Sequence, residues 1–274
     1  MTEPALASLV LSVEVDKPCT VSVDLGRAAQ AAFLGLVQVA TPELAARLHQ
    51  GEGLKPYTVS GLHGVGRSAH GQVALTPGRG YWLRFTSCDG ELSGLLWQWA
   101  ASPPRVLWLD PVPLRVLGAA VRPEAHPWAG QATWEGLVAA GMDAERPSTS
   151  LRYEFLSPTA FAAHGRDRLF PEPDLLFDGL ARRWDAFSPL KLGADVGRVA
   201  AEAWVVSRYE LSTRIVEYGP ERRIGFVGEC QYSAAGAEPL ALRASLVLAA
   251  FALYSGVGRR TGAGMGQVRA QAQG

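Results

Sequence analysis

The order of strand and helix patterns along the chain limits its fold more than any single residue does. Alternating apolar residues indicate strands, and apolar residues three or four apart indicate amphipathic helices. In the first half the order is strand, helix, strand, strand, helix, strand, over residues 8–15, 24–37, 57–62, 81–87, 92–99 and 106–121. The second half repeats it over residues 151–156, 177–187, 204–218, 222–232, 239–254 and 266–270. The pattern predicts an α+β chain of two tandem ferredoxin-like (RRM-like, β-α-β-β-α-β) domains, a fold that many functions share.

A proline-rich stretch separates the two patterns. Three prolines lie around a predicted short helix over residues 134–142, and such segments are typical of domain boundaries. We therefore predict an N-terminal domain over residues 1–125 and a C-terminal domain over residues 126–274. A chain of 274 residues is long enough for two domains of ordinary size.

Local signals refine this outline. Asp24 is predicted to cap the first helix, and Thr41-Pro42-Glu43 to begin a second, short helix that ends near His49. In the second unit, Gly219-Pro220 is predicted to form the turn of a long hairpin.

The stretch between the last helix and the last strand, residues 255–268, is rich in glycine and basic, with no acid. Its glycines and arginines are Gly256, Gly258, Gly262, Gly264, Gly266, Arg259 and Arg260. Nucleotide-binding glycine loops run from strand to helix, whereas this one begins at a helix C-terminus, which carries partial negative charge. Phosphates would therefore be attracted by the two arginines and by exposed N–H groups, which suits a nucleic-acid backbone better than a mononucleotide. The alternative is a flexible glycine-rich connection.

Composition restricts the function classes. The net charge is zero, which argues mildly against a nucleic-acid binder, but no acid follows Glu238, so the C-terminal part is locally basic. Three widely separated cysteines indicate reduced side chains. No uncharged apolar run reaches the length of about 18 residues that a membrane span needs. We expect a soluble, cytoplasmic protein with no membrane partner.

A candidate reaction centre lies in the first unit. His49 is in the last turn of the short helix, where the macrodipole favours a protonated ring. Lys55 follows after a two-glycine turn, so both side chains can approach one point. A histidine that gives or takes a proton, beside a lysine that neutralises a phosphorane, can cleave RNA through its own 2′-hydroxyl without a metal. A surface histidine near a lysine is also common in proteins where neither is catalytic, so both interpretations stay open.

Other ionisable groups give weaker signals. His63 and His70, in a glycine-rich segment, are interpreted as facing water rather than RNA. The arginine pairs at 182–183, 222–223 and 208/214 are interpreted as solvated rather than as phosphate clamps. No His, Cys or carboxylate set has zinc spacing, and no serine-hydrolase motif occurs, so the sequence predicts neither a metal nor a cofactor.

Three separated stretches resemble one family. They are Leu48-His49 followed by residues 55–62 (KPYTVSGL), residues 151–161 (LRYEFLSPTAF) and the terminal GVGRRTGAGMG. Together, in this order, they are similar to the CRISPR-associated repeat-processing endoribonucleases of the RAMP superfamily. The glycine motif marks that superfamily, and the histidine followed by K-P-Y-T-x-S narrows the match to the processing enzymes.

The resemblance implies metal-independent cleavage of CRISPR precursor RNA within the repeat, giving 2′,3′-cyclic phosphate and 5′-hydroxyl ends. It assigns His49 as general acid or base, Lys55 as stabiliser of the scissile phosphate, and the glycine-rich loop to RNA binding. Some members also place a catalytic tyrosine in the first helix. Residues 28–39 contain no tyrosine, so Tyr57, another group or none fills that role.

Two alternatives stay open. A non-catalytic RNA-binding subunit of a CRISPR effector complex would keep the double fold and the glycine loop. A phosphate-ligand enzyme using the loop alone is disfavoured by the helix-to-strand direction. The expected partner is CRISPR repeat RNA, and the resemblance also allows effector-complex proteins and a homodimer.

Overall fold

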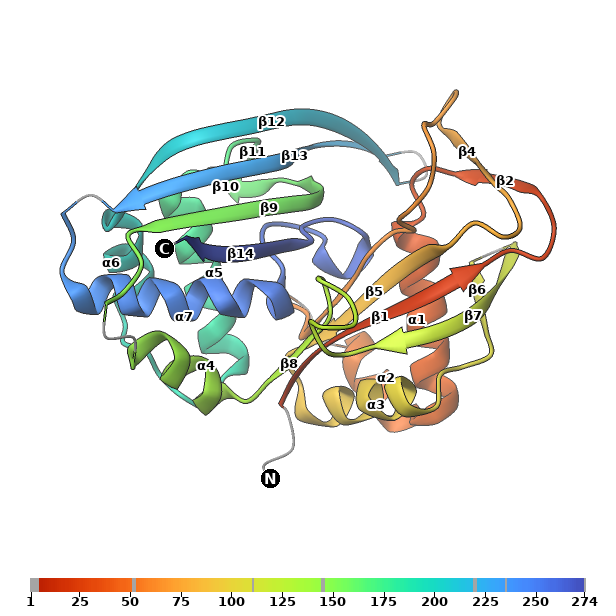
Figure 1. The fold of residues 1–274 in the computed structure, drawn as a ribbon, viewed down its shortest axis with the longest axis horizontal. Helices are drawn as coiled ribbons and strands as arrows, with labels where there is room; N and C mark the ends of the chain where they lie inside the picture. The colour runs from red at the N-terminus through yellow and green to blue at the C-terminus, as the bar shows by residue number, and fades with distance from the viewer. Residues whose placement is uncertain are drawn as a thin grey trace.

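The computed structural model describes residues 5–50, 53–109, 111–143, 146–218, 221–234 and 236–273. Two antiparallel sheets lie side by side, each with helices packed on one face (Figure 1). Among the described residues, no helix is both long enough and apolar enough to cross a bilayer.

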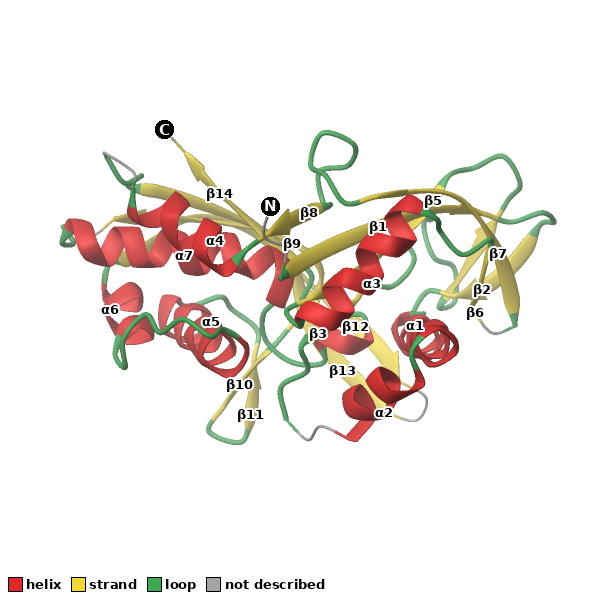
Figure 2. Cartoon of the chain, turned by 90° about the horizontal axis from the view of Figure 1, so that it is seen from below, coloured by secondary structure: helices red, strands yellow, loops and turns green. Residues whose placement is uncertain are grey.

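The first sheet has the strand order of a ferredoxin-like unit. Its elements are β1 (Leu6–Glu14), α1 (Gly26–Ala40), β3 (Tyr57–Val59), β5 (Tyr81–Ser87), α3 (Gly90–Ala101) and β7 (Val112–Ala120). The strands are arranged β3-β5-β1-β7, and β6 (Val106–Leu109) extends the edge beyond β7. Figure 2 shows α1 and α3 along one face of β1 and β5. The predicted β-α-β-β-α-β order is therefore confirmed for this half.

The first unit also contains a short helix and a small two-stranded ladder. The short helix α2 (Pro42–Gln50) follows α1 as predicted, and it buries Leu44, Ala45 and Leu48. A small ladder between β2 (Cys19–Ser22) and β4 (Gln72–Leu75) was not expected, because β4 lies in the glycine-rich segment.

The second sheet repeats the topology. Its elements are β9 (Ser150–Thr159), α5 (Pro173–Phe187), β12 (Trp204–Tyr218), β13 (Glu221–Ala234), α7 (Pro239–Ser255) and β14 (Val268–Gln273). The order is β12-β13-β9-β14, again ferredoxin-like. Additional elements are β8 (Gly130–Ala132), α4 (Trp134–Met142), β10 (Phe161–Ala163), β11 (Arg166–Arg168), α6 (Val196–Glu202) and the 3-10 turn Thr261–Ala263. The predicted turn at Gly219-Pro220 lies outside the described residues.

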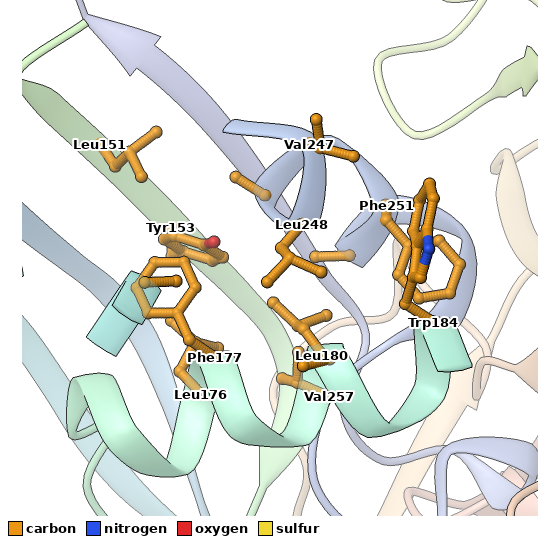
Figure 3. Close-up of a cluster of buried hydrophobic side chains, with 14 of the residues drawn as sticks. Leu151, Tyr153, Leu176, Phe177, Leu180, Trp184, Val247, Leu248, Phe251 and Val257 are labelled. Carbon is orange, nitrogen blue, oxygen red and sulfur yellow. The ribbon is translucent and has the colours of Figure 1, made fainter. Parts of the chain in front are cut away.

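A large apolar core holds α5 and α7 against β9. Figure 3 shows Tyr153 of β9 facing Phe177 and Leu180 of α5, with Leu248 of α7 between the layers. The rings of Trp184 and Phe251 meet edge to face, with centroids 5.3 Å apart. This packing explains why α7 is apolar nearly all round, and it fixes the helix end from which the glycine-rich loop departs.

The segment between the two sheets contacts both units. β8 pairs with β1 of the first sheet, whereas α4 packs on α7, where Gly141 leaves room for Val247. The boundary at residues 125/126 stays a prediction.

The predicted capping role of Asp24 is wrong. The N-cap of α1 is Leu25, and no side chain of the described residues caps the helix. Asp24 Oδ2 instead accepts the backbone N–H of Glu217 at 2.6 Å. Burial raises the pKa of this carboxyl. Asp24 therefore ties the start of α1 to β12 of the second unit, a contact that local sequence signals cannot indicate.

A fully buried arginine also joins the units. Arg84 of β5 donates to Ser8 Oγ at 2.8 Å and to Gln267 Oε1 at 2.6 Å. It also donates to the carbonyls of Trp128 and Leu253. Because its acceptors come from both halves of the chain, Arg84 holds them in one arrangement.

Candidate functional site

The glycine-rich loop fills the junction between the two units. A Cβ on Gly264, whose φ is +96°, would lie 2.7 Å from the Cα of Gly26 at the start of α1. A Cβ on Gly262 would lie 3.1 Å from the ring of Tyr57. These glycines are therefore needed for close packing of the loop against the N-terminal unit, whether or not RNA is present.

Several backbone N–H groups of the loop donate hydrogen bonds to carbonyl groups of the protein itself. The N–H groups of Val257, Arg259, Gly264 and Gly266 donate to carbonyls at 2.9–3.1 Å. The acceptors are Gly266, Ala160, Val59 and Pro158. The expectation of exposed N–H groups is wrong for these four, because one closes the loop on itself and three join it to neighbouring segments. An RNA-binding role for Gly256, Gly258, Gly262, Gly264 and Gly266 stays a prediction.

The two loop arginines are exposed but paired. Arg259 Nη1 lies 2.7 Å from Asp167 Oδ1, and Arg260 Nη2 lies 2.7 Å from Glu221 Oε2. Arg223 reaches both acids, at 3.7 and 3.3 Å. Three guanidinium groups thus share two carboxylates. An RNA phosphate would have to compete with these acids for the loop arginines.

His49 and Lys55 line one depression at the end of α2. The ammonium Nζ of Lys55 donates to the carbonyl of Leu48 at 3.1 Å, which places it beside the last helical turn. The His49 side chain is exposed on that turn. The same depression, of about 320 Å³, is lined by Arg27, Gln30 and Tyr57. The structure therefore brings the two predicted reaction groups together.

Tyr57 lies at the floor of this depression. Its hydroxyl accepts a hydrogen bond from Gln30 Nε2 at 3.2 Å, and burial raises its pKa. Arg27 and Gln30, which the sequence reasoning missed, lie on one face of α1. Their separation by three residues is the only signal that could have linked them.

A larger cavity adjoins the first. It has a volume of about 590 Å³, and Gln30 and Lys55 line both. The second unit contributes Arg182 and Arg183 of α5, and the loop contributes Arg259 and Arg260. No carboxylate occurs among the described residues that line it. The cation-rich wall runs from the first unit across the junction to the second.

The interpretation of the arginine pair in α5 as solvated holds for one member only. Arg182 is exposed, whereas Arg183 is 4% exposed. Arg183 Nη2 donates to the carbonyl of Gly258 at 2.9 Å and lies 3.4 Å from Thr261 Oγ1. Burial lowers the pKa of its guanidinium to about 10, which leaves it charged at neutral pH.

His63 lies away from this site. Its ring stacks on Trp82 with centroids 4.2 Å apart, and burial lowers its pKa to about 4. The side chain is half-buried, so the expectation that it faces water holds only in part for His63, whereas His70 is exposed as expected. His63 lines a different cavity, with Arg214 and Gly264. In the part of the chain that the structure describes, no three His, Cys, Asp or Glu side chains gather closely enough to hold a metal ion.

Known proteins share this architecture. The model of the CRISPR Cas6 N-terminal domain matches residues 6–139, and the model of the CRISPR-associated endoribonuclease Cas6 matches residues 153–268. The CRISPR-associated endoribonuclease Cas6 of Mycobacterium tuberculosis is 31% identical over 129 residues, 46% of this chain and 40% of that protein. The alignment thus spans well under two thirds of that relative's length.

Solved structures match over nearly the whole chain. The product complex of a Thermus thermophilus Cas6 has a TM-score of 0.77 and 27% identity, covering 98% of this chain and all of that one. Another structure of that Cas6 has a TM-score of 0.73 and 26% identity, covering 99% of this chain. Since the two family models follow one another along the two ferredoxin-like units, the chain belongs to the Cas6 family of CRISPR-associated endoribonucleases.

Proposed function

We propose that the protein is a metal-independent endoribonuclease that cuts CRISPR precursor RNA within its repeat. The observation that carries the proposal is that His49 and Lys55 share a depression that adjoins a cation-lined cavity at the domain junction. The relatives' names, CRISPR-associated endoribonuclease, and the Thermus thermophilus product complex support the same activity.

The reaction would be an internal transesterification. The 2′-oxygen attacks the adjacent phosphorus, the bond from phosphorus to the 5′-oxygen breaks, and a proton passes from the 2′-hydroxyl to the leaving oxygen. His49 would take or give that proton, because its imidazole is exposed at the depression. The ammonium of Lys55 would stabilise the phosphorane charge. The products are a 2′,3′-cyclic phosphate and a 5′-hydroxyl.

The third catalytic position stays open in this proposal. α1 offers Gln30 instead of a tyrosine, and Gln30 donates to the hydroxyl of Tyr57. The pair would orient the RNA at the depression rather than transfer the proton, since burial raises the pKa of Tyr57 and keeps its hydroxyl neutral.

Repeat RNA incubated with the protein in excess EDTA tests the proposal. We expect one discrete cut at an unchanged rate, and a 5′ fragment whose mass is lower by one water than that of a linear phosphate. Loss of cutting in EDTA would overturn metal independence. RNA that is bound but never cut would favour the non-catalytic effector subunit. Size measurements of the protein alone test the homodimer that the resemblance allows, and mixing with effector-complex proteins would test those partners.

A further inference from the structure

Arg183 is a buried cation with no carboxylate partner among the described residues. Its guanidinium Nη1 is buried and has no hydrogen-bond acceptor among the described residues. Neither Arg183 nor Arg182 has a carboxylate within 4.0 Å in the described chain. Burying an uncompensated charge costs free energy, so the position is unexplained by the fold alone.

A comparison with Arg84 shows that burial by itself does not create this situation. Arg84 also has no carboxylate partner in the described parts of the chain, but its guanidinium donates to four neutral oxygens. Within the same parts, Arg183 has only Gly258 O and Thr261 Oγ1, and it lines the cavity of about 590 Å³. Arg84 serves as an internal tie, whereas Arg183 adds positive charge to the wall of an open cavity.

The surroundings favour an anion. Arg182 and Lys55 line the same cavity, and the carboxylates beside the loop, Asp167 and Glu221, are occupied by loop arginines. A phosphate in this cavity would therefore meet Arg182 and Arg183, neither of which has a carboxylate within 4.0 Å among the described residues.

The cavity adjoins the proposed reaction site. Gln30 and Lys55 line both, and a strand of RNA in the depression of His49 would pass along them. We propose that Arg183, with Arg182, forms a subsite for a phosphodiester flanking the scissile phosphate. Because Arg183 also donates to Gly258 O, phosphate binding there would fix the loop and the RNA in register. This inference rests on the proposed function.

RNA with single methylphosphonate linkages tests the proposed phosphate subsite. Each substrate carries one neutral linkage near the cut mapped with unmodified RNA, and both affinity and single-turnover cleavage are measured. For the wild type, one linkage flanking the cut should lower affinity or rate by roughly tenfold to a hundredfold, the size of a charge-assisted hydrogen bond. Arg183→Met should lose a similar factor on unmodified RNA and should be insensitive to that linkage.

Three controls keep the result decisive. Arg198→Met removes an exposed charge of α6 that pairs with Glu202, and it should keep the wild-type sensitivity. Arg183→Lys retains a charge and should restore part of the effect. Thermal melting shows whether Arg183→Met is folded. If it is not folded, the wild-type measurements on the set of neutral linkages and the Arg183→Lys variant decide whether the subsite exists.

The outcomes separate the two proposals. Additive effects of Arg183→Met and the neutral linkage, or no sensitive linkage flanking the cut, would overturn the subsite. If the wild type binds RNA without cutting it, the nuclease proposal fails, and affinities measured with one neutral linkage moved along the whole repeat still decide whether Arg183 contacts an RNA phosphate. Inorganic pyrophosphate gives a further test. An equal rise in the melting temperatures of the wild type and of Arg183→Met would count against the subsite.

Discussion

The two ferredoxin-like units share a topology but differ in what they bring to the junction. The first unit offers His49 and Lys55 at the end of a short helix and its turn, where a proton donor is exposed. The second offers arginines from α5, which is buried on one face only, and from a loop locked by packing. The proposed function assigns the reacting groups to the first unit and the RNA-positioning charges to the second.

Replacing His49 should have the largest effect and tests the first part of this assignment. His49→Ala is expected to slow single-turnover cleavage by about two to four orders of magnitude, the usual contribution of general acid–base catalysis. RNA affinity should change little, because the exposed ring is only one of many groups at the depression. Cleavage that persists at the wild-type rate would move the reaction away from α2.

Replacing Arg84 tests whether the units act as one body. Arg84→Met should lower the free energy of unfolding by about 2–4 kcal/mol, because several buried acceptors lose their donor. Urea denaturation measures the change, and Arg115→Met, at an exposed ion pair with Glu14, is the matched control. If the two substitutions cost the same, Arg84 does not join the units.

Replacing Gly264 shows how much of the loss of stability comes from overpacking and how much from backbone strain. Gly264→Ala should destabilise by about 2 kcal/mol more than Gly193→Ala, since overpacking adds to the cost of a positive φ. Both glycines have positive φ, but a Cβ on Gly193 meets open space. Equal melting temperatures for the two variants would contradict the contact between the loop and α1.

Replacing the loop arginines should have the smallest effect. Arg259→Ala and Arg260→Ala are each expected to weaken RNA binding by a factor of about ten or less, because their carboxylate partners already occupy them. The slope of log affinity against log salt should flatten by about one for each phosphate that the variant no longer neutralises. An unchanged slope would remove the loop from the RNA interface.

The sequence was a good guide wherever the signal was local. Alternation in residues 8–15 predicts the strand observed as β1, and the apolar sequence of residues 239–254 predicts the buried helix observed over Pro239–Ser255. The Asp24 cap failed because a partner on β12 competes for the carboxylate. The β2–β4 ladder was missed because strands of four residues give little periodicity.

Local sequence signals predicted only part of the candidate site. His49 and Lys55 are close in sequence, so a turn could be foreseen to bring them together. Gln30 and Arg183 come from α1 and α5, and nothing in their local pattern indicates a shared cavity.

The sequence by itself determined the repeated order of strands and helices and the glycine content of the loop, because backbone preference and hydrophobic spacing act over a few residues. Only the tertiary structure decided that the glycines pack on α1, that the loop arginines meet Asp167 and Glu221, and that Arg183 is buried at a cavity. These contacts depend on how the two units dock, and the free energy of docking is carried by surfaces far apart in the chain.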